Sequence, residues 1–372
     1  MTPLASRPAR PIRTVTPAPD KLLLYCRAGF EKECAAEISE RAAAAGIHGY
    51  ARGIPGSAHV LFVPQDGGLG HLAGVDAREL VFARQAVVVG ATLAGLPERD
   101  RIGPLLAAAA ALGGPYCAVW LEHPDTNEGK ALSGLCRRLA PLFEKALAAA
   151  GLLAPERDKA RRLHVFFTAP TSALVGSANP RRSAPWPLGI PRLKMPAAAP
   201  SRSALKLAEA LLVFLTPEEQ AERLHEGISA VDLGAAPGGW TWQLVRQGLH
   251  VTAVDNGALG DVLAPALASG QVEHLRCDGL SYRPRRPVHW LVCDMVEKPA
   301  RIAALVAEWI AAGHAAEAIF NLKLPMKKRR EELERCRELI RQRLDADGIR
   351  GAWRFRQLYH DREEVTGWLR RR

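Results

Sequence analysis

Apolar, strand-like runs alternate with segments suited to helices through the second half of the chain, and this alternation restricts the fold more than any other feature. Strand and helix in regular succession build a parallel, doubly wound α/β sheet of the Rossmann-like kind. In such a sheet, ligands bind at the carboxyl ends of the strands. Strands are predicted at residues 228–234, 250–255, 272–278, 289–295 and 318–324, and, after a long basic helix, at 351–359 and 364–369.

The first of these strands runs into a turn of small residues, Gly-Ala-Ala-Pro-Gly-Gly at 234–239, and then into a helix. The glycine spacing G-x-x-x-G-G differs from the G-x-G-x-x-G of dinucleotide sites, which disfavours an NAD oxidoreductase. Acidic residues mark the ends of four successive strands. These carboxylates would repel a pyrophosphate but suit a sulfonium nucleoside with a free ribose diol, so we predict an S-adenosylmethionine site that uses Asp232, Asp255, Asp278 and Asp294.

Two lysines occupy positions in the sequence that are unusual for solvent-exposed surface lysines. Lys323 ends the strand at 318–324 between apolar residues, and Lys206 opens the helix that enters the domain. A ribose 2′-hydroxyl is a weak nucleophile, and a desolvated lysine beside a second cation can serve as its general base. We expect Lys323 to be that base and Lys206 its neighbour, with Asp294 and either Glu363 or Glu364 orienting them.

The first half of the chain reads as an α+β unit. Strands are predicted at 22–26, 59–63, 86–89, 116–121 and 163–168, with helices from about Glu31 and over 129–150. Between Pro170 and Pro200 there are seven prolines and four basic residues without an acidic one, which is typical of a linker. The expected organisation is a disordered basic tail at 1–20, an α+β region at 21–170, a linker at 171–200 and the Rossmann-like domain at 201–372.

Composition narrows the partners and the compartment. With 372 residues, of which 48% are hydrophobic and 24% charged, we expect a soluble two-domain protein. The uncharged stretch 102–121 is interrupted by Pro104 and by Gly113-Gly114-Pro115, which predicts a helix, a turn and a strand and no membrane segment. Seven scattered cysteines without a C-x-x-C pair disfavour both disulfides and a zinc site, and no secretory signal is expected, so a cytoplasmic location is predicted.

The net charge points to a polyanionic partner. Lys and Arg outnumber Asp and Glu by 50 to 39, and residues 321–372 hold 16 basic and 9 acidic residues, which is +7 of the total +11. We therefore expect the C-terminal part to meet nucleic acid, with the run Met-Lys-Lys-Arg-Arg at 326–330 as a candidate phosphate contact. The alternative for this run is a solvated helix face balanced by Glu331, Glu332 and Glu334.

Several motifs together resemble the RlmM-type 23S ribosomal RNA 2′-O-ribose methyltransferases of bacteria. They are Asp-Leu-Gly-Ala-Ala-Pro-Gly-Gly-Trp at 232–240, Cys-Asp-Met-Val-Glu-Lys-Pro at 293–299, Asn-Leu-Lys-Leu-Pro-Met-Lys-Lys at 321–328 and Gln-Leu-Tyr-His-Asp-Arg-Glu-Glu-Val-Thr at 357–366. Shorter matches occur at 25–34, 82–85, 125–128 and 189–194. The resemblance covers about residues 21–370, and the first 20 residues fall outside it.

The resemblance implies an N-terminal THUMP-containing RNA-binding region, an FtsJ-like methyltransferase domain and a cytidine of 23S RNA, free or in a large-subunit precursor, as substrate. It implies that S-adenosylmethionine is bound by Ser203, Ala236, Pro237, Gly238, Gly239, Asp255, Asp278 and Asp294. It implies a catalytic tetrad of Lys206, Asp294, Lys323 and Glu364, with Lys323 taking the proton. A monomer without a metal is expected.

Two other readings compete with this one. A base-directed methyltransferase needs Asn/Asp-Pro-Pro-aromatic at the end of the fourth strand to hold a flipped base, and this chain has Asp294-Met295-Val296 there. Methylation at carbon 5 needs a cysteine nucleophile, expected after a proline, and the chain has no Pro-Cys pair. A non-catalytic RNA-binding or ribosome-assembly factor would retain the fold but would not need the four tetrad residues.

Overall fold

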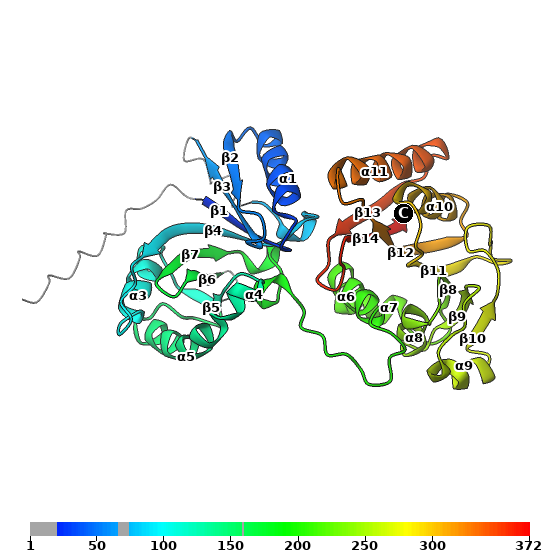
Figure 1. Cartoon of the computed structure of the whole chain (residues 1–372), viewed down its shortest axis with the longest axis horizontal. Coiled ribbons are helices and arrows are strands. Elements are labelled where there is room, and N and C mark those ends of the chain that lie inside the picture. The colour runs from blue at the N-terminus through cyan, green and yellow to red at the C-terminus, as the bar shows by residue number, and fades with distance from the viewer. Residues whose placement is uncertain (1–20, 66–73, 158–159) are drawn as a thin grey trace, which may run out of the picture. The chain divides into compact units, whose positions relative to one another are not determined.

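The computed structural model describes residues 21–65, 74–157 and 160–372, so the predicted tail at 1–20 lies outside the described residues. The chain forms two compact units (Figure 1). The first ends at Ile190, and the second begins at Pro191 and also includes Glu79–Val81.

The first unit is a seven-stranded sheet in the order β2-β3-β1-β4-β7-β6-β5, with only β5 and β6 parallel. Its core includes Phe143 and Leu147 of a helix that packs beside β5. The elements are β1 (Lys21–Cys26), α1 (Glu31–Ala44), β2 (Gly49–Gly53), β3 (His59–Pro64), η1 (Ala77–Glu79), β4 (Ala83–Ala94), α3 (Ile102–Ala111), β5 (Tyr116–Glu122), α4 (Asn127–Lys130), α5 (Ser133–Ala149), β6 (Arg161–Ala169), β7 (Ser172–Ala178), η2 (Pro180–Arg182) and η3 (Pro187–Gly189).

The five strands predicted in this unit are confirmed, and the stretch 102–121 is the expected helix, turn and strand. Two strands, β2 and β7, were not predicted. Strand β2 has the sequence Gly-Tyr-Ala-Arg-Gly and is largely exposed, so it carries no apolar alternation. The predicted helix at 129–150 is two helices, α4 and α5, separated at Ala131 and Leu132.

The predicted linker at 171–200 is wrong in its first part. Strand β7 lies in this range, pairs with β4 and β6, and contributes Ala173 and Val175 to the core. The error arises because Pro170 precedes the strand, while the remaining prolines of the stretch begin only at Pro180. The first unit therefore extends to Ile190.

The second unit is a seven-stranded sheet in the order β10-β9-β8-β11-β12-β14-β13, which confirms the predicted Rossmann-like fold. The first five strands in this order are parallel, and β14 is antiparallel to both of its neighbours. The elements are α6 (Ala204–Phe214), α7 (Pro217–Arg223), β8 (Ser229–Leu233), α8 (Gly239–Val245), β9 (His250–Val254), η4 (Asp261–Leu263), α9 (Ala264–Ala268), β10 (Val272–Leu275), β11 (Val288–Cys293), α10 (Pro299–Ala311), β12 (Ala315–Lys323), α11 (Arg329–Ala346), β13 (Gly351–Arg356) and β14 (Glu364–Arg371).

Both faces of this sheet are covered by helices. In β11, Trp290 and Val292 belong to the cluster that also holds apolar residues of α6 and α8, while the alternate residues Leu291 and Cys293 do not. Helix α10 packs on β12 and on α11, and the two helices lie together on one side of the sheet (Figure 1). Burial on both faces explains why the parallel strands read as apolar runs.

The seven cysteines are all described and all free, as the sequence predicts. Among the described residues, none of the helices is long and apolar enough to cross a membrane.

Candidate active site

The turn between β8 and α8 lies close to the segment that enters α6. Gly238 has a φ of +102°, and a Cβ there would lie 2.4 Å from Leu263 Cδ1. A Cβ on Gly239 would lie 2.2 Å from Ser203 Oγ and 2.5 Å from Ser201 Oγ. Because any larger residue would push the two serines away, the glycines bring hydroxyls and backbone into one small cradle.

Asp255, directly after β9, is tied to the same turn. Its Oδ2 accepts a hydrogen bond from the backbone N–H of Ala236 at 3.1 Å, and its Oδ1 accepts one from Gly257 at 2.7 Å. Each carboxylate oxygen has a second lone pair, so Asp255 can still accept bonds from a ligand hydroxyl. Asp278, after β10, is exposed and accepts a hydrogen bond from the N–H of Leu280.

Two adjoining cavities share Gly234, Ala236 and Asp294. One, of about 340 Å³, is lined by Asp255 and Asp278, and the other, of about 230 Å³, by Ser203 and Pro237. The first offers carboxylates for a ribose diol, and the second offers hydroxyl and backbone groups for an amino acid tail. The donor set fits S-adenosylmethionine, and of the predicted cofactor residues Gly238 and Gly239 shape the turn without lining these cavities.

Asp232 differs from the other three acids of the strand ends. It is fully buried, and its Oδ2 accepts a hydrogen bond from Thr241 Oγ1 at 2.7 Å. Burial raises the pKa of Asp232 to about 7. It lines neither cavity and instead ties the end of β8 to α8 through Thr241, so the prediction that groups it with Asp255, Asp278 and Asp294 is wrong for this residue.

The two lysines and the two carboxylates predicted as a tetrad lie together. Lys323 Nζ is 2.7 Å from Asp294 Oδ1 and 3.7 Å from Glu364 Oε1. Lys206 Nζ is 2.8 Å from Glu364 Oε1 and 3.5 Å from Asp294 Oδ2. The four side chains are no more than 24% exposed, which leaves the charges partly desolvated but open on one side.

Electrostatics distinguish the members of this cluster. Burial lowers the pKa of Lys206, but the carboxylates of Asp294 and Glu364 outweigh burial, and the net pKa is raised. Burial acts to raise the pKa of Glu364, but the N–H of Arg362 and the charge of Lys206 outweigh it, and the net pKa is lowered. Lys206 and Glu364 therefore form a fixed ion pair next to Lys323.

The register of β12 with β14 decides between Glu363 and Glu364. Lys323 pairs directly with Glu364 in this antiparallel ladder, so both side chains point to the same face. Glu363 points elsewhere and forms an ion pair with Arg329 at 2.5 Å. The structure thus brings Glu364 to the lysines.

Sequence reasoning missed three polar residues behind the tetrad. Asn321 donates from Nδ2 to Asp294 Oδ1 at 3.0 Å, and Thr366 and Asp361 lie behind Asn321. The two-residue spacing of Asn321 from Lys323, and of Thr366 from Glu364, was the available signal, because alternate residues of a strand share a face.

A larger cavity of about 800 Å³ opens beside the tetrad. It is lined by Lys323 and by residues around the start of α10 and along α11, among them Lys298, Arg301 and Arg335. Val296 and Glu297 line both this cavity and the one with Asp255, so the two spaces adjoin. Lys323 therefore lines the larger cavity, which is bordered by both basic and acidic side chains, and reaches the smaller one through its contact with Asp294.

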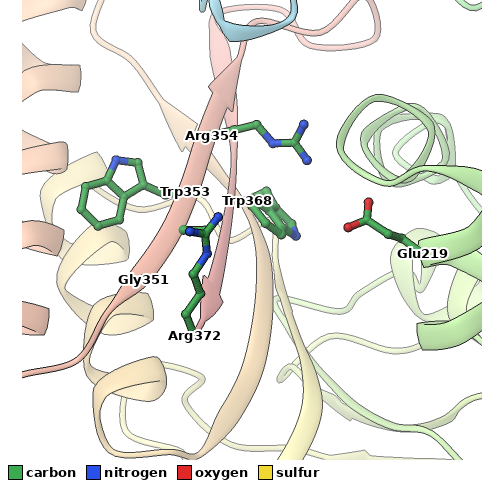
Figure 2. Close-up of a pocket in the computed structure, with 7 residues that line it drawn as sticks. Glu219, Gly351, Trp353, Arg354, Trp368 and Arg372 are labelled. Carbon is green, nitrogen blue, oxygen red and sulfur yellow. The ribbon is translucent and has the colours of Figure 1, made fainter.

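Another hollow, of about 520 Å³, lies at the far end of the same sheet and does not belong to this site. Figure 2 shows Arg354 and Glu219 reaching toward Trp368 from two sides. Arg354 lies over the Trp368 ring at 4.8 Å, and Glu219 caps α7 and pairs with Arg223. These polar groups already have structural partners.

Three family descriptions match the chain in succession: RlmM ferredoxin-like domain at residues 20–87, Ribosomal RNA large subunit methyltransferase M, N-terminal, at 100–179, and FtsJ-like methyltransferase at 199–324. The protein called Ribosomal RNA large subunit methyltransferase M in Methylococcus capsulatus is 56% identical over 356 residues, which cover 95% of this chain and 98% of that protein. The chain belongs to the ribosomal RNA large subunit methyltransferase M family. The predicted family is thereby confirmed.

Further members of the ribosomal RNA large subunit methyltransferase M family are similar over nearly the same length. Proteins of this name from Azoarcus sp. and from Xanthomonas campestris pv. campestris are each 52% identical, covering 94% and 93% of this chain and 95% and 97% of those proteins. Membership makes the chain an rRNA methyltransferase with an FtsJ-like domain. Membership also confirms the predicted cofactor, because FtsJ-like methyltransferases use S-adenosyl-L-methionine.

Proposed function

We propose that this protein methylates the 2′-hydroxyl of a cytidine ribose in 23S ribosomal RNA, with Lys323 as the general base. The observation that carries the proposal is the cluster in which Lys323 Nζ lies 2.7 Å from Asp294 Oδ1 and beside the ion pair of Lys206 and Glu364. A lysine held in this way, lining a larger cavity and in contact with Asp294 of the donor site, suits proton removal from a weakly acidic alcohol.

The methyl donor is assigned to the two cavities at the ends of β8 and β9. When bound, it supplies a methyl group activated by its sulfonium. Asp255 would accept hydrogen bonds from the ribose diol, and Ser203 with the turn at Ala236 and Pro237 would hold the amino acid tail. Asp294 lines both cavities and also contacts Lys323, so it links donor position to base position.

The target nucleotide is assigned to the cavity of about 800 Å³ beside Lys323. Its lining includes Lys298, which suits an RNA phosphate. It also includes Arg301 and Arg335, which form ion pairs with Glu297 and Glu332 of the same lining. The nucleotide's 2′-hydroxyl would point to Lys323 Nζ, which takes the proton as the oxygen bonds to the methyl carbon. The bond between that carbon and the donor sulfur breaks in the same step, so S-adenosylhomocysteine leaves. Asp294 and Glu364 would stabilise the ammonium formed at Lys323, and Lys206 would remain charged throughout.

The N-terminal unit is proposed to bind the RNA, and the enzyme to act as a monomer in the cytoplasm on 23S RNA or its precursor. The net charge of +11 fits a polyanionic substrate. The seven free cysteines fit a reducing compartment.

Replacement of Lys323 tests the base. Lys323→Ala should lose turnover by about 10²–10⁴-fold, the usual share of a general base, while donor and RNA still bind. Lys323→Arg should be nearly as inactive, because guanidinium does not give up its proton near neutral pH. Single-turnover methyl transfer to 23S RNA measures both, with Lys145→Ala, a change of an exposed lysine on α5, as the control.

The product distinguishes ribose from base methylation. A 2′-O-methyl group blocks alkaline cleavage of the adjoining phosphodiester, so digestion should release an alkali-resistant dinucleotide that begins with cytidine. An active Lys323→Arg enzyme would show that Lys323 is only a fixed charge. A product fully cleaved by alkali would overturn the 2′-O assignment.

A further inference from the structure

A buried chain of hydrogen bonds runs from the tetrad to Asp361, in the turn between β13 and β14. Asn321 Nδ2 donates to Asp294 Oδ1 at 3.0 Å, and Thr366 Oγ1 donates to Asn321 Oδ1 at 2.7 Å. The Asp361 carboxyl oxygens lie 3.0 and 3.2 Å from Thr366 Oγ1. Asn321 and Thr366 are fully buried and Asp361 is 1% exposed, so water does not serve these groups.

The number of hydrogens available determines which group donates in each of these hydrogen bonds. Asp294 accepts hydrogen bonds from the Nζ atoms of Lys206 and Lys323, so Asn321 turns its NH₂ toward Asp294 and its Oδ1 toward Thr366. Thr366 has one hydroxyl hydrogen, which is used on Asn321. The contact between Thr366 and Asp361 then needs a hydrogen from Asp361. The backbone N–H of Leu358 donates to Asp361 Oδ2 at 3.0 Å, which leaves Oδ1 to carry that hydrogen.

We propose that Asp361 is a positioning residue that works as a neutral carboxylic acid, and that its proton orients Thr366, Asn321 and finally Asp294 toward Lys323. The proposal rests on the proposed function, because it concerns how the base is held. Asp361 lines none of the three cavities described around the tetrad and acts only through its neighbours.

The surroundings of Asp361 favour its neutral form. The pKa of Asp361 is raised to about 8, mainly by burial and also by the charges of Glu209 and Glu364. The N–H of Leu358 and the charge of Lys206 act in the opposite direction. Glu209, on α6, is itself held by the N–H groups of Tyr359 and His360 and by the His360 ring. The charged groups that face Asp361 are therefore Glu209 and Lys206 from α6 and Glu364 from β14, with His360 beside it in the turn.

Ionisation of Asp361 should disturb the base. A carboxylate at this position would attract the Thr366 hydrogen, and Asn321 Oδ1 would lose its donor. Asn321 would then no longer be held with its NH₂ toward Asp294, and a new negative charge would lie buried behind the tetrad. Turnover should therefore fall as the pH rises past about 8. This fall on the alkaline side is separate from the rise of turnover with pH that a lysine base produces at lower pH.

The experiment is the pH profile of single-turnover methyl transfer by the full-length enzyme, with calorimetry of S-adenosylmethionine binding as a check of folding. Asp361→Asn keeps a donor toward Thr366 and an acceptor for Leu358 but cannot ionise. Its profile, scaled to its own maximum, should lack the alkaline fall of the wild type. An alkaline fall that persists in Asp361→Asn would overturn the proposal.

A second pair of variants keeps the test decisive if Asp361→Asn does not fold. Thr366→Val breaks the chain at equal size and should lower kcat at least tenfold with little change in KM, whereas Thr366→Ser should restore most of the turnover. Thr366→Val with wild-type kcat would overturn the proposal. Failure of the proposed function would give different results: an active Lys323→Arg enzyme, or a wild-type pH profile in which turnover does not rise with pH on the acidic side.

Discussion

At the scale of single residues, the acids at the strand ends have similar sequence positions but different tasks. Asp232 is fully buried and ties β8 to α8 through Thr241, whereas Asp255 accepts hydrogen bonds from two backbone N–H groups at the rim of the donor cavity. Asp294 contacts both Lys206 and Lys323. Their environments, and not their residue type, separate a structural acid from a ligand-binding one and from one that holds a base.

Asp255→Ala should weaken the binding of S-adenosylmethionine by about 10–100-fold, because hydrogen bonds to a charged group typically contribute about 1.5–3 kcal/mol. RNA affinity should stay nearly unchanged. Titration calorimetry measures the first and filter binding the second. Asp261→Ala removes an exposed carboxylate outside both donor cavities and is the matched control. Equal donor affinity in the two variants would contradict the assignment of Asp255.

At the scale of elements, the pairing of β12 with β14 assembles the catalytic cluster. Lys323 pairs with Glu364, and three residues earlier along β12, Phe320 pairs with Gly367. A glycine usually weakens a strand. Here it is required, because a Cβ on Gly367 would lie 2.5–2.9 Å from three ring atoms of Phe320.

Gly367→Ala should destabilise the protein by about 1–3 kcal/mol, the usual cost of overpacking a core, and should reduce turnover through the displaced register. Thermal unfolding measures the first effect. Gly134→Ala is the control, since a Cβ there meets no atom within 4 Å and an alanine within α5 should be neutral or slightly stabilising. A Gly367→Ala protein as stable as Gly134→Ala would show that Phe320 moves aside at no cost.

At the scale of the whole molecule, fewer of the basic side chains near the C-terminus are available to bind RNA than the number of Lys and Arg residues indicates. Within α11, Arg337 pairs with Glu334, Arg341 with Glu338, and Arg343 with Asp347. Much of α11 is therefore a solvated, charge-balanced helix face, which was the alternative to a phosphate-binding run. Lys327 and Lys328 precede α11 and are exposed, whereas Arg329 is 13% exposed and pairs with Glu363.

Neutralising Lys327 and Lys328 together should weaken RNA binding and flatten its dependence on salt. Each lost phosphate contact removes about 0.9 from the slope of log K against log salt on duplex and about 0.7 on single strands. The double variant Arg337→Gln, Arg341→Gln removes the same formal charge from paired positions and should change the slope less. Affinities at several salt concentrations measure both, and equal slopes would assign the two lysines to a solvated surface.

The amino-acid sequence by itself determined the class of fold, the acidic strand ends, the small-residue turn and the two lysines. Each of these depends on local periodicity or on motifs contiguous in the chain. The family resemblance was equally local, because it rests on short runs of residues.

Only the tertiary structure decided which residues meet. The choice of Glu364 over Glu363, the burial of Asp232 and the chain from Asp294 to Asp361 follow from long-range pairing, above all from the insertion of β14 between β12 and β13. A one-residue slip in that ladder would turn Glu364 to the other face. The register between two strands is set by packing across the whole sheet. The local sequence around each strand therefore does not show which residues of a distant strand it will pair with.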